Sequence, residues 1–184
     1  RYLINDEPWL YPEGHLAEAY KRVTAYWNRF ILNMATGGET GGELHGRWQV
    51  SNIFFYHVAC PHCGELFYPR WSPPEGFRDN DQLWGGMRWD SKCRDKVTGR
   101  WDYNALRETI YLSCPNNGCE IKDTPPNRRA MSSKGEYFLH QGGAVDERKG
   151  FHYNFIAVDW VPFYVVVEEW TKAIYSMRYG DDTL

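Results

Sequence analysis

Four of the five cysteines in this sequence stand in two close pairs, a spacing that favours metal binding. Two thiolates on one tight turn can hold a metal ion, and two such turns supply the four sulfur ligands of a closed tetrahedral zinc site. Such a site leaves no open coordination position, so the metal is expected to be structural. The sequence predicts one Zn²⁺ bound by Cys60 and Cys63 of CPHCG together with Cys114 and Cys119 of CPNNGC.

The alternative is that these residues are buried free cysteines or a redox pair. A redox Cys-x-x-Cys motif needs no second pair, and an odd number of cysteines without a secretory signal does not suit a disulfide framework. Cys93, between Lys92 and Arg94, is expected to stay free. His62 lies inside the first turn, where four sulfurs already complete the ligand set.

A pair of carboxylates, Asp6 and Glu7, follows the short apolar run Tyr2–Ile4. The run predicts a buried strand, and a strand that ends in Asp-Glu has a specific use in nucleotide hydrolases built on a parallel sheet. There the Asp holds Mg²⁺ and the Glu orients the attacking water. The alternative is a solvated turn, because Asp-Glu after apolar residues is common in loops.

The next elements favour the catalytic hypothesis. Apolar residues at helical spacing predict a helix over residues 14–28, and Phe30–Met34 predicts a second strand. The order strand, helix, strand is typical of a parallel α/β sheet. Thr36 then stands at the strand end, where such ATPases place a polar residue that senses the γ-phosphate. The phosphate loop G-x-x-x-x-G-K-[ST] does not occur in the sequence, so we expect it upstream of Arg1, in a longer protein.

The rest of the chain differs in character from this beginning. A glycine-rich stretch predicts a linker, both cysteine pairs lie in strand-like sequence interrupted by a polar insertion, and the last part predicts an aromatic strand and a helix. In that helix, at about 162–178, Glu168 and Glu169 are expected to face solvent. The predicted regions are 1–38, the linker 39–47, the cysteine-bearing region 48–140 with its insertion at 72–105, and 141–184.

Composition narrows the possible classes of protein. The chain has 184 residues, 42% of them apolar, which is enough for a packed core, and its formal net charge of -3 provides no overall basic field. Any contact with nucleic acid must therefore come from local patches. No run reaches the roughly 18 apolar residues of a membrane helix, and a signal-peptide pattern is absent. We expect an intracellular protein without membrane contact.

Three segments of the sequence resemble the large subunits of GpA-type terminases, which package the DNA of tailed phages. They are YLINDEPWLYPEGHLAEAYKR, GRWQVSNIFFYHVACPHCGE and GFHYNFIAVDWVPFYVVVEEWTKA, and the resemblance covers most of the chain outside residues 72–108. The order of the segments is more specific than any one of them. The resemblance implies an α/β fold: the C-terminal part of a P-loop ATPase core with a parallel sheet, then a zinc-ribbon-like β region and a C-terminal helix.

The same resemblance implies a function for the parent protein. It would be an ATP-driven motor that moves double-stranded viral DNA into a preformed capsid, with a nuclease domain beyond this sequence that cuts the DNA into genome units. Asp6 would bind Mg²⁺, Glu7 would be the general base, and Thr36 would couple hydrolysis to motion, with ATP and Mg²⁺ bound by the full-length parent. The implied partners are the terminase small subunit, the capsid portal and further copies of the chain, in the host cytoplasm.

This sequence departs from the family at three places. The family usually has Ser-Thr-Pro at the second strand end, where this chain has Ala35, Thr36 and Gly37. Its second cysteine turn is longer, and its insertion is large. The first departure makes the assignment of Thr36 weaker than that of Glu7, whereas the other two concern the orientation of the insertion and leave the predicted zinc site intact.

A different class of protein remains as the alternative: a stand-alone zinc-ribbon module that binds nucleic acid or another protein. Basic residues near the cysteine turns could contact phosphates, and neighbouring aromatic rings could stack on bases. These residues are Arg70, Arg128, Arg129 and Lys134, with Trp71 and Tyr137. A simpler interpretation is that the charges form a solvated face.

Overall fold

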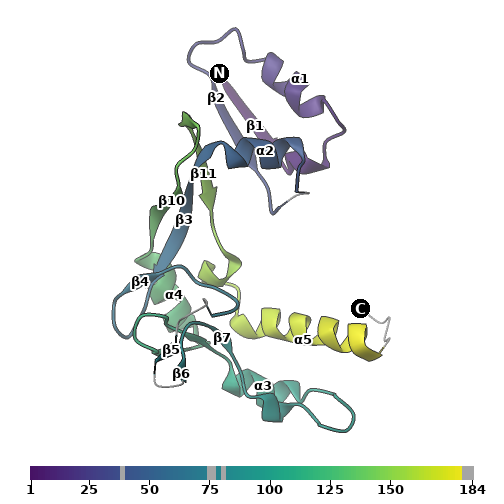
Figure 1. Ribbon diagram of the computed structural model, residues 1–184, viewed down its shortest axis with the longest axis vertical. Coiled ribbons are helices and arrows are strands. Elements are labelled where there is room, and N and C mark those ends of the chain that lie inside the picture. Colours follow the sequence, from purple (N-terminus) through teal and green to yellow (C-terminus); the bar gives the residue numbers. More distant parts are fainter. Residues whose placement is uncertain (38–39, 74–77, 80–81, 180–184) are drawn as a thin grey trace. The chain divides into compact units, whose positions relative to one another are not determined.

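The computed structural model describes residues 1–37, 40–73, 78–79 and 82–179 (Figure 1). Parts of the predicted linker, insertion and C-terminal region, at 38–39, 74–77, 80–81 and 180–184, lie outside the described residues. The chain forms two compact units: unit 1 is Arg1–Ile53 with Leu139–Gly150, and unit 2 is Phe54–Phe138 with Phe151–Leu184. Strands β3 (Ser51–Ala59), β10 (Glu136–Gln141) and β11 (Val145–His152) each contribute residues to both units and pair in the order β10-β3-β11.

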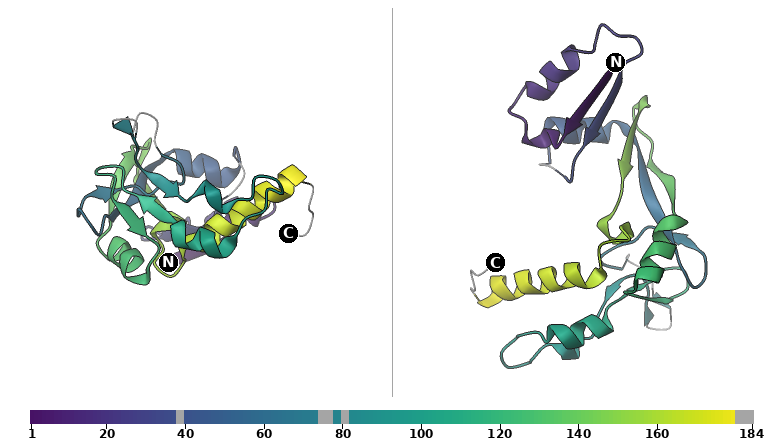
Figure 2. Two further views of the ribbon diagram at one scale, coloured as in Figure 1. Left: turned by 90° about the horizontal axis from the view of Figure 1, so that it is seen from below. Right: turned by 180° about the vertical axis from the view of Figure 1, so that it is seen from behind.

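Unit 1 is built on a pair of parallel strands. The parallel strands are β1 (Tyr2–Asp6) and β2 (Phe30–Met34). The unit also contains the 3-10 turn η1 (Pro8–Leu10) and the helices α1 (His15–Lys21) and α2 (Glu43–Gln49). Strands β1 and β2 lie side by side with α1 next to them (Figure 2). Asn5 on β1 donates to Asn33 on β2 at 2.8 Å, and Asn33 donates to the Tyr20 hydroxyl of α1 at 2.7 Å. The strand, helix, strand order and the parallel pairing predicted from the sequence are confirmed.

Helix α1 is shorter than the predicted helix over residues 14–28. It ends at Lys21, after which the backbone closes tighter bonds between residues three apart, including Val23 N–H to Tyr20 O at 3.1 Å. The Thr24 hydroxyl also donates to the Lys21 carbonyl at 2.8 Å. β-branched side chains are stiff in a helix, and a threonine hydroxyl that binds a nearby carbonyl offers the backbone an alternative to helix. The apolar residues after Lys21 keep helical spacing in the sequence, but the backbone there is no longer an α-helix, so spacing alone placed the end of the helix too late.

The predicted linker at residues 39–47 contains most of helix α2. Arg47 pairs with Glu43 one helical turn earlier at 2.8 Å, and its guanidinium lies 4.0 Å from the centre of the Tyr20 ring. These contacts order a sequence whose glycine content predicted a loop. The boundary between the two units falls after Ile53, not within 39–47.

Unit 2 contains two antiparallel hairpins that each carry one cysteine turn. One is formed by β3 and β4 (Leu66–Phe67), the other by β8 (Tyr111–Ser113) and β9 (Glu120–Lys122), with β7 (Gly86–Arg88) pairing along β8. The remaining elements are β5 (Arg78–Asp79), β6 (Gln82–Leu83), η2 (Ser91–Cys93), α3 (Tyr103–Thr109), α4 (Pro125–Ser133), η3 (Phe155–Ala157) and α5 (Phe163–Tyr179). Since Met87 of β7 is buried in the core, part of the predicted insertion at 72–105 belongs to the fold.

Helix α5 confirms the prediction of a helix over about 162–178. Phe163, Val167 and Thr171, at spacings of four, are buried. Glu168, however, does not face solvent as predicted: its side chain is 12% exposed, and it pairs with Arg107 of α3. The helix therefore has a wider buried face than its apolar residues indicate. Among the described helices, none is both long and apolar enough to span a membrane.

Candidate metal centre and strand-end carboxylates

The first cysteine turn joins β3 to β4. The Cys60 amide donates to the Glu65 carbonyl, and the Gly64 amide donates to the Cys60 carbonyl, both at 2.9 Å. Gly64 has a φ of +80°, a left-handed backbone conformation that residues other than glycine rarely adopt. The turn brings the sulfur atoms of Cys60 and Cys63 within 4.8 Å of each other.

The second turn, between β8 and β9, repeats these backbone bonds. The Cys114 amide donates to the Cys119 carbonyl and the Gly118 amide to the Cys114 carbonyl, again at 2.9 Å. Gly118 has a φ of +64°, and a Cβ there would lie 2.9 Å from the Trp84 indole nitrogen. By this match Cys114 corresponds to Cys60, Gly118 to Gly64 and Cys119 to Glu65. Asn117 therefore occupies the position of Cys63, and the second cysteine of this turn comes two residues later.

Three of the four predicted ligands, Cys60, Cys63 and Cys119, form one group despite this displacement, and the fourth, Cys114, lies outside that group but next to one of its members. The sulfur atoms of Cys60, Cys63 and Cys119 all lie within 4.8 Å of one another, and Cys114 Sγ lies 3.9 Å from Cys63 Sγ. A tetrahedron with metal–sulfur bonds of about 2.3 Å has sulfur atoms roughly 3.8 Å apart, whereas a disulfide requires about 2.05 Å. The spacing of the three grouped sulfurs, and that of Cys114 from Cys63, is therefore that of neighbouring metal ligands and not that of a disulfide, and all four residues are free cysteines.

The surroundings of the four thiols differ. Burial disfavours the thiolate of Cys63, but hydrogen bonds from the Asn117 side chain and the Glu65 backbone outweigh burial and lower its pKa to about 7. Burial raises the pKa of Cys114 to about 12 and, with the nearby Cys60 sulfur, raises that of Cys119 to about 11. A cation in their midst would favour every thiolate, because each ligand binds a metal in its deprotonated form.

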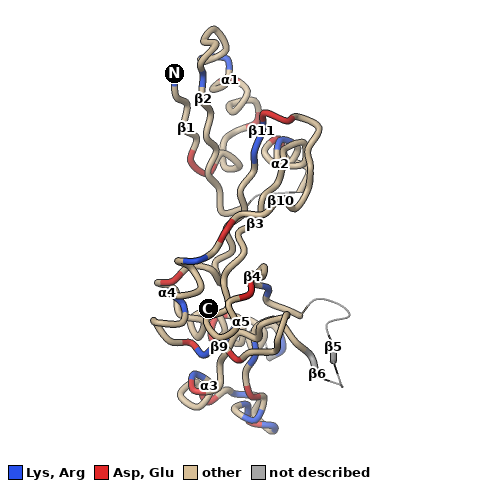
Figure 3. The backbone as a smooth tube through the Cα atoms, turned by 90° about the vertical axis from the view of Figure 1, so that its left-hand side faces the viewer, with Lys and Arg blue, Asp and Glu red and all other residues tan. Residues whose placement is uncertain are grey.

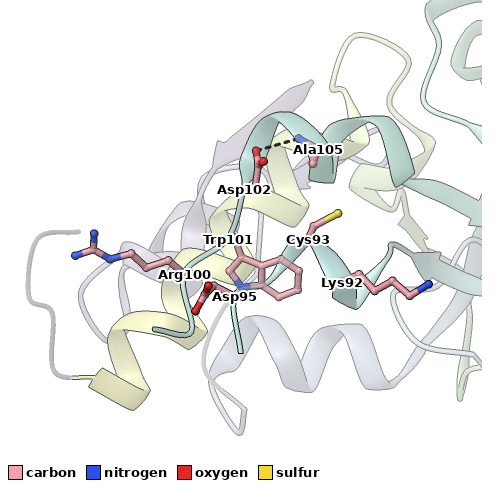
Figure 4. Close-up of a pocket in the computed structure, with 7 residues that line it drawn as sticks. All are labelled: Lys92, Cys93, Asp95, Arg100, Trp101, Asp102 and Ala105. Carbon is pink, nitrogen blue, oxygen red and sulfur yellow. Dashed lines mark hydrogen bonds between the residues drawn. The ribbon is translucent and has the colours of Figure 1, made fainter. Parts of the chain in front are cut away.

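Cys93 belongs to a separate part of unit 2. It lines an open pocket of about 490 Å³ whose walls include Trp101 and Asp102 (Figure 4). The Asp102 amide donates to the Cys93 carbonyl at 2.8 Å, and the Asp102 side chain caps α3. In the part of the chain that the structure describes, Cys93 is not a member of the candidate metal-binding group.

The predicted carboxylates lie where β1 ends beside β2. Asp6 is exposed and stands opposite Met34 in the parallel register. The Glu7 amide donates to the Met34 carbonyl at 2.8 Å. Glu7 itself has a φ of +45°, the only positive φ of a non-glycine residue in the described chain. Left-handed backbone at a residue with a side chain is strained and is found disproportionately at functional sites.

The Glu7 carboxylate makes contacts that the sequence indicated only in part. Its two oxygens accept hydrogen bonds from the Thr36 amide at 3.1 and 3.2 Å, and one accepts from the Trp9 indole nitrogen at 2.5 Å. These hydrogen bonds lower the pKa of Glu7, and the bond from the Trp9 indole lowers it more than the bond from the Thr36 amide. The structure thus brings the predicted Glu7 and Thr36 together, and it adds Trp9, whose position two residues after Glu7 was the only sequence signal.

Two of the residues predicted to contact nucleic acid, Arg128 and Trp71, are engaged inside the protein. Arg128 is buried and pairs with Asp123, so it cannot reach a phosphate in this conformation. Trp71 packs against Trp89 and Trp170 at centroid distances of 5.6 and 5.7 Å. Lysine and arginine are interspersed with acidic residues through unit 2 (Figure 3). The prediction of Arg128 as a phosphate contact is wrong, because the burial of an arginine requires a partner inside the protein.

Comparison with protein families identifies the chain. The family model described as phage terminase large subunit gpA, ATPase domain, matches residues 2–137, which is more than half of the sequence and includes both strand-end carboxylates and the four cysteines predicted as metal ligands. Neither the comparison with curated proteins nor that with solved structures found a match. The chain belongs to the family of ATPase domains of phage terminase large subunits of the gpA type.

Proposed function

We propose that unit 1 is the Walker B end of the ATPase core of a DNA-packaging motor, with Glu7 as the general base. The observation that carries this proposal is the contact between Glu7 and Thr36, which joins the carboxyl ends of two parallel strands. In open α/β sheets, ligands bind beyond those ends. The lowered pKa of Glu7 supports an ionised carboxylate, which a base requires before it takes a proton from water.

In this proposal Asp6 and Thr36 have separate tasks. Asp6 is exposed at the same strand end, where it can hold Mg²⁺ through water. A bound Mg²⁺ would supply positive charge beside the phosphates of ATP, and Asp6 would be the residue of this chain that holds it. Thr36 senses the state of the γ-phosphate at the end of β2 and passes it to Glu7 through their hydrogen bonds.

The free face of the β1–β2 pair supports a larger ATPase core. Tyr2 is 82% exposed, and the exposed residues beside it on that face include Ile4, Phe30, Leu32 and Met34. Parallel sheets are normally covered on both faces, because their connections place helices there. We infer that further strands and helices of the full-length subunit cover this apolar face.

We further propose that unit 2 holds one structural zinc ion in a zinc-ribbon-like pair of hairpins. Cys60 and Cys63 would bind it from the β3–β4 turn, and Cys114 and Cys119 from the β8–β9 turn. The ion would supply a cross-link between the two hairpins, since four sulfur ligands leave no position for a reacting molecule.

The full-length subunit would then be a packaging motor and endonuclease. Its partners would be double-stranded viral DNA, the terminase small subunit, the capsid portal and other copies of itself, in the host cytoplasm. This part of the proposal rests on membership of the family.

The deciding experiment replaces Glu7 with Gln in the full-length subunit. A general base acts in the transition state, so ATP turnover should fall on the order of a hundredfold to ten-thousandfold while nucleotide affinity changes little. Turnover is measured as the rate of phosphate release, and nucleotide affinity is measured by equilibrium titration. Parental turnover in Glu7→Gln would overturn the catalytic assignment and leave Asp6-Glu7 as a turn after a strand.

A further inference from the structure

The indole of Trp9 makes a contact that packing alone does not require. Its nitrogen donates to Glu7 Oε2 at 2.5 Å, although the side chain is 41% exposed and could donate to water. The η1 turn fixes the backbone that carries the ring: the Leu10 amide donates to the Glu7 carbonyl at 3.0 Å, and the Tyr11 amide donates to the Pro8 carbonyl at 3.2 Å. Pro8, at the start of this turn, restricts the backbone between the two side chains.

The same carboxylate is held from β2. The Thr36 amide donates to both of its oxygens, and the Glu7 backbone amide donates to the Met34 carbonyl. An ionised carboxylate has about four acceptor sites. Trp9 and Thr36 thus restrict the rotation of the carboxylate and leave acceptor capacity for a water molecule.

We propose that Trp9 is a positioning residue for Glu7, whose indole N–H fixes the orientation of the carboxylate that activates the attacking water. This inference rests on the proposed role of Glu7 as the general base. The indole also stabilises the charged carboxylate, since it donates a hydrogen bond that the protonated form accepts less strongly. Loss of the N–H should therefore raise the pKa of Glu7 and leave the carboxylate free to turn away from the water.

The first test measures the Glu7 carboxylate directly in the 184-residue chain, without ATP. Side-chain carboxyl ¹³C shifts of Glu7 are followed as pH is varied, in parent, Trp9→Phe and Trp9→Gln. Phe keeps an aromatic ring but lacks the N–H donor. Gln carries an N–H donor that is separated from Cα by the same number of bonds as the indole nitrogen of Trp. The midpoint should rise in Trp9→Phe and return toward the parental value in Trp9→Gln. Trp27→Phe is the matched control, since Trp27 is 93% exposed in the same unit.

The second test uses ATP turnover by the full-length subunit. Trp9→Phe should lower kcat roughly tenfold to a hundredfold, because misplacing a catalytic group by about 1 Å has an effect of this size. KM for ATP should stay near the parental value, and the acid limb of the kcat profile should move to higher pH, since a base with a raised pKa is ionised only at higher pH. Trp9→Gln should recover part of kcat.

The two tests separate this inference from the proposed function. If Glu7→Gln abolishes turnover but Trp9→Phe matches Trp27→Phe in both the carboxyl titration and kcat, then the role of Trp9 is overturned while that of Glu7 stands. If Glu7→Gln turns over normally, the proposed function fails, and the role of Trp9 in catalysis fails with it. A raised titration midpoint together with a lowered kcat in Trp9→Phe, both reversed by Gln, supports the inference.

Discussion

Asn117 occupies in the second cysteine turn the position that Cys63 occupies in the first, and its side chain donates a hydrogen bond to the Cys63 sulfur. The second turn has therefore moved its second cysteine to position 119 while keeping the same backbone bonds and a glycine with positive φ. This relationship allows the ligand set to be tested by moving a cysteine along the turn.

Moving the cysteine should restore a metal site after the displaced ligand is removed. Cys119→Ser should weaken zinc binding, because a hydroxyl replaces one of four thiolates. The double variant Asn117→Cys/Cys119→Ser should regain one zinc per chain, since its turn then has the spacing of the first. Metal content after dialysis and competition with a chelator measure both effects. Failure of the double variant to bind more zinc than Cys119→Ser would contradict the equivalence of the two turns.

Zinc content should depend on the four predicted ligand cysteines and not on Cys93. We expect about one zinc per parent chain, loss of the metal in Cys114→Ser, and full retention in the matched control Cys93→Ser. Chelation of the parent should unfold much of residues 48–140, because metal binding supplies folding free energy in small zinc units. Elemental analysis and circular dichroism are the measurements. Zinc loss in Cys93→Ser, or zinc retention in Cys114→Ser, would show that the ligand set is wrong.

Asp6 and Glu7 should differ in their effects on nucleotide binding. In the full-length subunit Asp6→Asn should weaken Mg²⁺-dependent ATP binding as well as turnover, since Asp6 would hold the ion that helps to bind the phosphates of ATP before the reaction as well as during it. Glu7→Gln should affect turnover alone. Titration of ATP with and without Mg²⁺ distinguishes the two. Equal ATP affinity in Asp6→Asn and parent at limiting Mg²⁺ would exclude the metal-binding role.

The buried pair of Arg128 and Asp123 should make a large contribution to the stability of unit 2. Arg128 also donates to the Asp159 carbonyl at 2.9 Å, and Asp123 accepts from the Tyr164 amide at 3.0 Å. Arg128→Met should reduce the free energy of unfolding by about 3–5 kcal/mol, because it leaves a buried carboxylate without its partner.

Arg129→Met is the control for this measurement. Arg129 is exposed on the same helix, so its removal should change stability by only about 0.5 kcal/mol. Both variants are compared with the parent by denaturant unfolding of the zinc-loaded chain. Equal stability of the two variants would mean that the buried pair is replaceable by apolar packing.

His152 should make stability depend on pH. Burial lowers its pKa, and its Nδ1 lies 2.9 Å from the Tyr68 hydroxyl. A histidine whose pKa is lower when folded binds protons more readily in the unfolded chain, so its stabilisation is present above an unfolded pKa of about 6.5 and is lost as pH falls. His152→Gln should therefore lose less stability than the parent between pH 7.5 and pH 5.5.

The control for His152 of β11 is the exposed His140, which lies on β10 in the same four-stranded sheet. His140→Gln should keep the parental pH dependence of the thermal midpoint. Comparing differences between variants removes the pH dependence of zinc binding, which is common to all of them. An unchanged slope in His152→Gln would contradict the prediction.

The sequence by itself determined features that depend only on residues close together along the chain. Phe30–Met34 was predicted as a strand with the bounds that β2 has, and α5 was predicted within one or two residues of its ends. Turn residues and apolar periodicity act over a few positions, so they are readable without the rest of the fold. The same locality explains why Cys-x-x-Cys spacing and the order Asp6-Glu7 could be interpreted chemically.

Only the tertiary structure decided which of these local features meet. The contact of Glu7 with Thr36 spans 29 residues, and that of Cys63 with Cys114 spans 51, distances over which no pattern specifies a contact. The burial of Glu168 likewise depends on Arg107, a residue of another helix. A charged side chain can be buried when a partner compensates its desolvation, and that partner is set by packing. The contacts of Trp9 with Glu7 and of Asn117 with Cys63 were likewise found only in the structure, because a hydrogen bond between side chains depends on how they pack.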